Sequence, residues 1–169
     1  MNVRFSLDDA QSASDDWGMN CGPGALAASL GMTLDDVRPH MGDFERKGYT
    51  NPTLMNDALR SIGCSWRKLG AIWPKWGLVR IQWEGPWTKP GVPMRVRYRH
   101  THWVGSSYDV GMFKVFDINC MSVGGWVDFD EWKDSVVPWI LKETTPKASG
   151  GWHVTHALEI ERLQLARAG

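Results

Sequence analysis

The sequence predicts an α+β domain in which several helices precede an antiparallel sheet. Residues 21–31 and 51–63 carry helix start and stop signals, whereas residues 78–83, 112–117 and 152–160 alternate in the way that strands do. Strands that follow one another without a helix between them favour antiparallel pairing, because a parallel pair needs a long crossover. We therefore expect N-terminal helices packed on an antiparallel sheet, within one domain of residues 1–169.

The composition is that of an ordinary globular protein. Hydrophobic residues make up 43% of the chain and charged residues 22%. The 19 basic and 19 acidic residues cancel, which argues against nucleic acid as a partner. The chain has no apolar run of membrane-spanning length, and its N-terminus lacks the apolar core of a signal peptide. We expect no membrane association and a cytoplasmic location.

The three cysteines have no regular spacing, so they predict neither a disulfide framework nor a paired metal motif. We expect no cofactor and no metal. The eleven tryptophans are more unusual, since they supply large flat apolar surfaces for a core, a groove or an interface.

The first third of the chain predicts an extended segment followed by helices. Residues 1–19 show little periodicity and are expected to form a strand or arm and then a loop. A helix from Cys21 ends at Gly31, and Thr33 begins a short second helix with a capping-box pattern. A third helix begins at Asn51 as its cap, buries one face and ends at Gly63.

Strands dominate the remainder. Residues 78–83 predict a half-buried strand, 84–94 a surface connection, and 96–105 a second strand that begins near Val96 and Tyr98. A third strand covers 112–117, and a short helix is expected near 129–132. We expect strands again at 136–141 and 152–160, joined by a polar linker over 144–151.

Cys21 lies at the start of its helix, in Asn20-Cys21-Gly22-Pro23-Gly24. The free amide groups and the positive end of the helix dipole there lower the pKa of a thiol and favour the nucleophilic thiolate. The alternative is that Cys21 is only a small buried residue, since free cysteine is often buried. A nucleophile also needs a base from another part of the chain.

The strand pattern offers His100 or His102 as this base and Asp117 as its partner. His100 and His102 share a face of the predicted strand, and Asp117 ends the strand that follows a tight turn. A carboxylate beside an imidazole fixes the tautomer and stabilises its cation. Asn119, two residues further on, is a second candidate for orienting the imidazole. The alternatives are a core histidine and an ordinary turn aspartate; His153 and His156 are expected on opposite faces of their strand.

The stretch Asn20-Cys21-Gly22-Pro23-Gly24-Ala25-Leu26-Ala27 resembles the nucleophile motif of the papain-like peptidases that cut double-glycine leader peptides from bacteriocins. His102-Trp103-Val104 and Val115-Phe116-Asp117 are similar to that family's base and orienting segments, in the same order. The resemblance covers roughly residues 11–140. It implies a papain-like fold in a bacterial or phage protein, with Cys21, His102 and Asp117 as a catalytic triad that cleaves a peptide or amide bond of a peptide or protein substrate.

The sequence departs from this family at the donor for the oxyanion. The family places a glutamine six residues before the nucleophile, and Asp15 stands there in this chain. An ionised aspartate only accepts hydrogen bonds, so it cannot stabilise an oxyanion. Gln11 and Asn20 are the remaining amide candidates.

Two other functions fit the same residues. One is a binding module that keeps the fold without turnover, such as a phage or mobile-element protein that binds a host factor. The other is a metal site made by Cys21, His100, His102 and Cys120, although these residues lack paired spacing. Trp103 and the tryptophans between Trp73 and Trp87 either line a groove or pack in the core.

Overall fold

The computed structural model describes residues 4–18 and 20–163. Within these residues six strands form one antiparallel sheet, in the order β1-β6-β2-β3-β4-β5. The strands are β1 (Cys64–Lys68), β2 (Trp76–Trp83), β3 (Thr101–Asp109), β4 (Met112–Phe116), β5 (Trp126–Asp128) and β6 (Trp152–Leu163). The prediction of an α+β chain with helices packed on an antiparallel sheet is confirmed.

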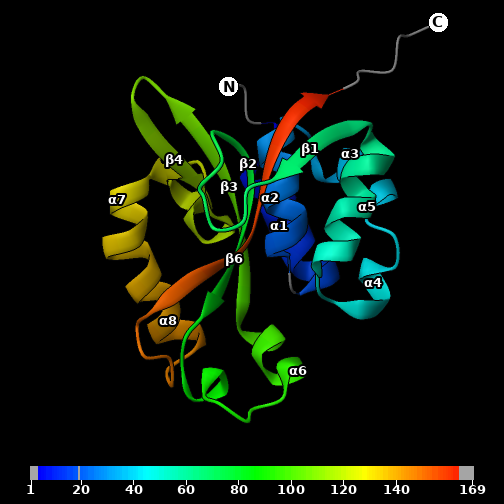
Figure 1. Cartoon of the computed structure of the whole chain (residues 1–169). Coiled ribbons are helices and arrows are strands. Elements are labelled where there is room, and N and C mark those ends of the chain that lie inside the picture. The colour runs from blue at the N-terminus through cyan, green and yellow to red at the C-terminus, as the bar shows by residue number, and fades with distance from the viewer. Residues whose placement is uncertain (1–3, 19, 164–169) are drawn as a thin grey trace, which may run out of the picture.

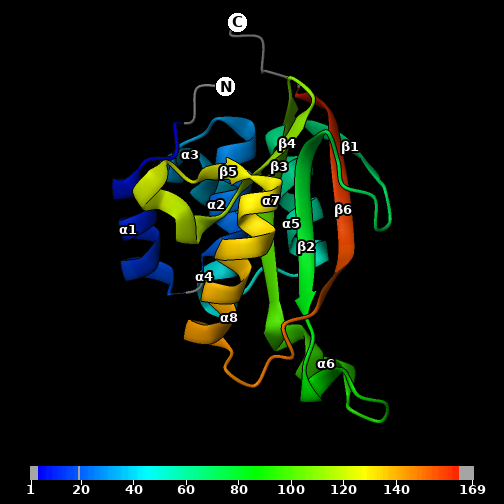
Figure 2. The ribbon, with the colours of Figure 1, turned by 90° about the vertical axis from the view of Figure 1, so that its left-hand side faces the viewer.

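Helices cover both faces of this sheet (Figures 1 and 2). The first face carries α1 (Leu7–Trp17), α2 (Cys21–Leu30), α3 (Leu34–Val37), α4 (Phe44–Lys47) and α5 (Pro52–Ile62). The second face carries α7 (Phe129–Glu131) and α8 (Val137–Thr144), and α6 (Met94–Arg97) lies at one end of the sheet.

The sheet therefore separates two apolar cores. Leu78 of β2 packs in the core beneath α2, whereas its neighbour Val79 packs in the core beneath α8. Both side chains are fully buried. The expectation of a half-buried strand at residues 78–83 is wrong, because helices from the two ends of the chain cover both faces of β2.

Three helices of the first layer agree with their sequence signals. Gly31 ends α2 in the left-handed conformation, with φ of 66°. Thr33 and Asp36 form the expected capping box of α3. The Asn51 side chain accepts a hydrogen bond from the amide of Leu54 at 2.8 Å, which begins α5 at the predicted position.

Helix α1 replaces the strand or loop that was expected before Cys21. Ser6 accepts from the amide of Asp9, and the Asp9 carboxylate accepts from the Ser6 amide at 2.8 Å. The same type of capping box begins α3. The periodicity of the segment is weak because only Ala13 of the helix is fully buried.

Residues 136–141 are also helical rather than extended. Trp132–Val136 form a π-helical stretch between α7 and α8, and Pro138 lies in the first turn of α8, where its missing amide proton costs little. Val137, Ile140 and Leu141 are buried on one face. A short apolar run such as residues 136–141 does not by itself distinguish a helix from a strand, and packing on the sheet decides between the two.

The strand expected from Val96 begins only at Thr101. Residues 94–97 form α6 and residues 98–100 a 3₁₀ turn, because the buried Gln82 amide donates to the carbonyls of Arg97 and His100 and holds the turn closed. His100 and His102 therefore do not share a strand face.

A β-bulge in β6 changes the sheet faces on which His153 and His156 lie. His156 pairs with Arg80 and Val154 with Ile81, so Thr155 is an extra residue in this strand. His153 pairs with Gln82, two residues from Arg80. The bulge returns His153 and His156 to the same face, and the prediction of opposite faces is wrong.

Candidate active site

Cys21 is the first residue of α2, and its side chain is partly exposed at the edge of a pocket. The Asn20 carbonyl already accepts from the Gly24 amide at 3.0 Å, so the helix begins in register with the cysteine. Gly22 lies against Thr50, where a Cβ atom would overlap the threonine side chain. The absence of a side chain at Gly22 thus allows the loop over residues 47–53 to approach the start of the helix.

His102 lies near the beginning of β3 and is only 7% exposed. Its Nε2 atom is 2.9 Å from Oδ2 of Asp117, which follows β4. The Cys21 thiol is near enough to the same imidazole for each group to shift the pKa of the other. Because Asp117 occupies Nε2, Nδ1 is the nitrogen left for the thiol. The structure brings together the cysteine, histidine and aspartate that the sequence singled out.

Asp117 is fully buried and accepts four hydrogen bonds. Besides His102, its Oδ2 accepts from Nε1 of Trp132 at 2.9 Å. Its Oδ1 accepts from the backbone amide and the side-chain amide of Asn119, both at 2.9 Å. Asn119 therefore holds the carboxylate rather than the imidazole, and the structure gives the position beside Nε2 to Asp117.

These contacts shift the ionisation of all three groups. Burial alone would raise the pKa of Cys21, but the hydrogen bond and positive charge of His102 lower it overall. Burial opposes protonation of His102, yet the charge and hydrogen bond of Asp117 raise the pKa of the imidazole well above its usual value. The pKa of Asp117 is lowered despite its burial, chiefly by the charge of His102. The arrangement favours the thiolate of Cys21 and the imidazolium of His102 over their neutral forms.

Trp83 and Trp132 were not identified from the sequence as parts of this cluster. The Trp83 ring stacks on the His102 ring with centroids 5.7 Å apart, and both rings are buried. Trp132 supplies the indole donor to Asp117 from the opposite helical layer. No local sequence signal indicates either contact, because each joins segments that are distant in the chain.

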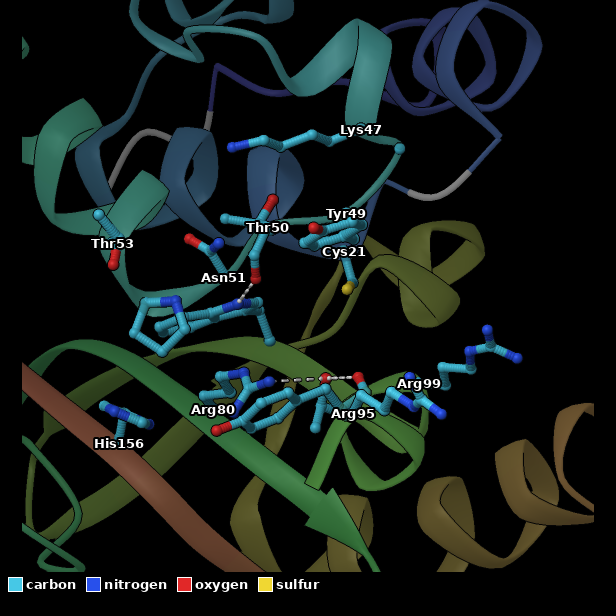
Figure 3. A pocket seen from close by; sticks show the side chains of 16 residues that line it. Cys21, Lys47, Tyr49, Thr50, Asn51, Thr53, Arg80, Arg95, Arg99 and His156 are labelled. Atoms are coloured by element: carbon cyan, nitrogen blue, oxygen red, sulfur yellow. Dashed lines mark hydrogen bonds between the residues drawn. The ribbon is translucent and has the colours of Figure 1, made fainter. Parts of the chain in front are cut away.

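A pocket of about 830 Å³ lies beside Cys21 (Figure 3). The residues that border it come from α2, from the 47–53 loop, from α6 and the turn after it, and from β2, β3 and β6. Trp103 lines this pocket and donates through its indole to the carbonyl of Thr50 at 2.8 Å. Most other tryptophans between Trp73 and Trp87 pack in the core; Trp83 and Trp87 are 4% and 6% exposed.

The structure does not bring Gln11 to the thiol. Its side chain is exposed on α1 and donates to Asp15 at 2.9 Å, away from the residues that line the pocket. The expectation that Gln11 supplies the oxyanion donor is wrong, because the segment expected to fold back as a loop is helical. Asn20 directly precedes Cys21, and its side chain makes no capping hydrogen bond. It remains the candidate amide.

The four residues of the alternative metal site are not assembled. His100 stacks on Trp87, with ring centroids 3.6 Å apart, in the turn before β3. In the part of the chain that the structure describes, no group of three or more histidine, cysteine, aspartate or glutamate side chains is placed to hold a metal ion. Over the same residues, no helix combines the length and apolar character that crossing a bilayer requires.

A cysteine beside an imidazole, which a buried carboxylate orients, has the parts required for nucleophilic attack on a carbonyl. The helix start adds backbone amides beside the sulfur. No protein-family model matches the chain, and no curated protein matches it.

Proposed function

We propose that this protein is a papain-like cysteine hydrolase that cleaves a peptide or amide bond of a peptide or protein substrate. The observation that supports it most strongly is the cluster of Cys21, His102 and Asp117 at the edge of a pocket, in which Asp117 is hydrogen-bonded to the imidazole that lowers the thiol pKa. The resemblance of the segments around Cys21, His102 and Asp117 to double-glycine leader peptidases points the same way.

In this mechanism the Cys21 thiolate attacks the carbonyl carbon and forms a tetrahedral intermediate. The His102 imidazolium then donates a proton to the leaving amine, and the acyl group remains on the sulfur. Neutral His102 next accepts a proton from water, whose oxygen attacks the thioester. The resulting intermediate collapses to release the acid product, which restores the thiolate of Cys21 and the imidazolium of His102. Asp117 keeps the imidazole oriented throughout.

Selective alkylation of Cys21 tests the nucleophile. The thiol pKa is lowered, so iodoacetamide should modify Cys21 well below the ordinary thiol pKa of about 8.5. Burial raises the pKa of Cys64 to about 11 and that of Cys120 to about 12, so both should react slowly. Rates at each cysteine are measured by mass mapping across pH; an inflection for Cys21 above about 8.5 would contradict the proposal.

The sign of this pH dependence follows from the two shifts. As pH falls through the lowered thiol pKa, Cys21 gains a proton and alkylation slows. As pH rises through the raised imidazole pKa, His102 loses the proton that the leaving amine requires. Hydrolysis should therefore follow a bell-shaped profile, whereas alkylation should keep its upper plateau.

Removing the oxyanion donor is a test that distinguishes a hydrolase from a binding module. We expect Asn20→Ala to lower hydrolysis by roughly 10²-fold, because an oxyanion donor acts mainly in the transition state. Gln11→Ala, which removes an exposed amide of α1, is the matched control and should leave hydrolysis unchanged. The measurement is kcat/KM on a peptide substrate together with thermal unfolding.

The alternative function is a papain-like binding module without turnover. It is supported by Gln11, whose side chain is exposed and donates to Asp15. It predicts that Asn20→Ala is silent and that no peptide is cleaved. Asp15→Gln would then be the variant to examine for weak hydrolysis, since the resemblance places the missing glutamine there.

A further inference from the structure

The pocket beside Cys21 is strongly basic although the whole chain is neutral. Arg80, Arg95, Arg99, Lys47 and His156 line it, and none of its lining residues is an aspartate or glutamate. Lys47 lies 3.3 Å from Asp43, so its charge has a partner. The three arginines border the space into which the Cys21 side chain points (Figure 3).

Arginines elsewhere on the described surface behave differently. Five of the six outside the pocket whose side chains are described have a carboxylate within ion-pair distance; these are Arg4, Arg38, Arg46, Arg60 and Arg67. The sixth, Arg97, donates instead to the carbonyl of Lys89 at 3.4 Å. Within residues 4–18 and 20–163, no carboxylate lies at that distance from Arg80, Arg95 or Arg99. Three of the four described guanidinium groups that lack a carboxylate partner therefore line the pocket, and the net charge of the chain does not explain this.

Arg80 is the most informative of the three because it is only 3% exposed. Its two terminal nitrogens reach the hydroxyls of Thr155 and Thr101 at long distances of 3.3 Å, and its buried Nε has no hydrogen-bond partner. The guanidinium carbon lies 5.3 Å from the centre of the Tyr98 ring. A buried cation without a carboxylate partner is costly, so hydrogen-bond acceptors for this group are too few.

The sheet register places Arg80 on the face of β2 that lines the pocket, where its charge interacts with that of Cys21. Arg80 pairs with Trp103 of β3, the residue after His102, and with His156 of β6. Arg95 and Arg99 come from α6 and the turn that follows it, and both are exposed at the pocket. The site thus has one buried guanidinium and two exposed ones that can attract an anion from solvent.

We propose that Arg80 binds a carboxylate of the substrate, so that the enzyme acts on acidic peptides. This inference rests on the proposed cysteine hydrolase function and names its substrate class. The planar fork of a guanidinium matches a carboxylate with two parallel hydrogen bonds, and the two terminal nitrogens, which reach Thr155 and Thr101 only at 3.3 Å, are the donors available for it. The carboxylate belongs either to a glutamate or aspartate side chain or to the C-terminus of the peptide.

A pair of chloroacetyl probes of equal shape tests the inference without knowledge of the natural substrate. Chloroacetyl-glutamate amide and chloroacetyl-glutamine amide differ in one charge, and each alkylates a thiolate with release of chloride. We expect the glutamate probe to modify Cys21 about tenfold faster, with the ratio falling at high salt. A third probe, chloroacetyl-glutamine with a free C-terminus, identifies a terminal carboxylate as the source if it alone is fast.

Variants assign the preference to a residue. Arg80→Gln should bring the ratio of the two rates close to one, whereas Arg60→Gln, which removes an exposed and paired arginine outside the pocket, should keep the wild-type ratio. Thermal unfolding reports whether Arg80→Gln still folds. If it does not, the double variant of the exposed residues, Arg95→Gln with Arg99→Gln, should still lower the ratio.

The outcomes separate this inference from the function on which it rests. Equal rates for all three probes at a reactive Cys21 would overturn the carboxylate site and leave the hydrolase proposal intact. A Cys21 that reacts with none of the probes, nor with iodoacetamide, would overturn both.

Discussion

Replacing His102 with alanine is expected to lower peptide hydrolysis by about 10²–10⁴-fold, because the imidazole both activates the thiol and protonates the leaving amine. The same change should move the pKa of Cys21 up toward its ordinary value, since the hydrogen bond and charge of His102 hold it down. Alkylation of Cys21 at neutral pH should slow accordingly. The measurements are kcat/KM and the pH profile of iodoacetamide labelling.

His100→Ala is the matched control for this prediction. His100 lies two residues away, but its ring stacks on Trp87 and not on the catalytic cluster. Its removal should affect stability and leave the labelling profile of Cys21 in place. A dead His100 variant beside an active His102 variant would contradict the assignment of the base.

Asp117→Ala is expected to reduce the free energy of unfolding by about 3–5 kcal/mol, because it removes one partner of a buried ion pair. Four donors would lose their acceptor at once: Nε2 of His102, Nε1 of Trp132 and both amides of Asn119. The imidazole would also lose the charge that raises its pKa, so the thiolate of Cys21 should become less favourable. Urea unfolding and the labelling profile measure the two effects.

Asp128→Ala provides the comparison on the surface. Asp128 pairs with Lys114 at 3.8 Å, and both side chains are about half exposed. Such a pair contributes about 0–1 kcal/mol, so its loss should be small and should not move the pH profile. If Asp117→Ala does not fold, Asp117→Asn keeps one acceptor oxygen and should show an intermediate loss. An Asp117 variant as stable and as reactive as the wild type would contradict the role assigned to the carboxylate.

The sequence correctly predicted the helices whose ends are set by neighbouring residues. The helix from Cys21 to Leu30 and the helix capped by Asn51 are set by residues within one turn of their ends, so their bounds agree with the sequence. The same logic was available for α1, since Ser6 and Asp9 form a capping box, but the weak apolar periodicity obscured it.

Segments with two possible periods could not be assigned in this way. The short apolar run over residues 136–141 suits either a strand or a helix, and only packing against the second face of the sheet selects the helix. Likewise, Val96 and Tyr98 look like the start of a strand until the Gln82 side chain closes the turn through the carbonyls of Arg97 and His100.

By itself, the sequence offered Cys21, because helix-start chemistry is local, and Asp117, because it ends an alternating strand. The choice of His102 over His100 came from the resemblance of His102-Trp103-Val104 to the leader peptidases. Only the tertiary structure decided that Asn119 supports Asp117 instead of His102, that Trp132 and Trp83 enclose the pair, and that Gln11 is exposed. It also decided that Arg80 is a buried cation without a carboxylate partner among the described residues. The physical reason is the same in each case: burial and hydrogen-bond partners depend on segments far apart in the chain, and local patterns carry no information about which of them meet.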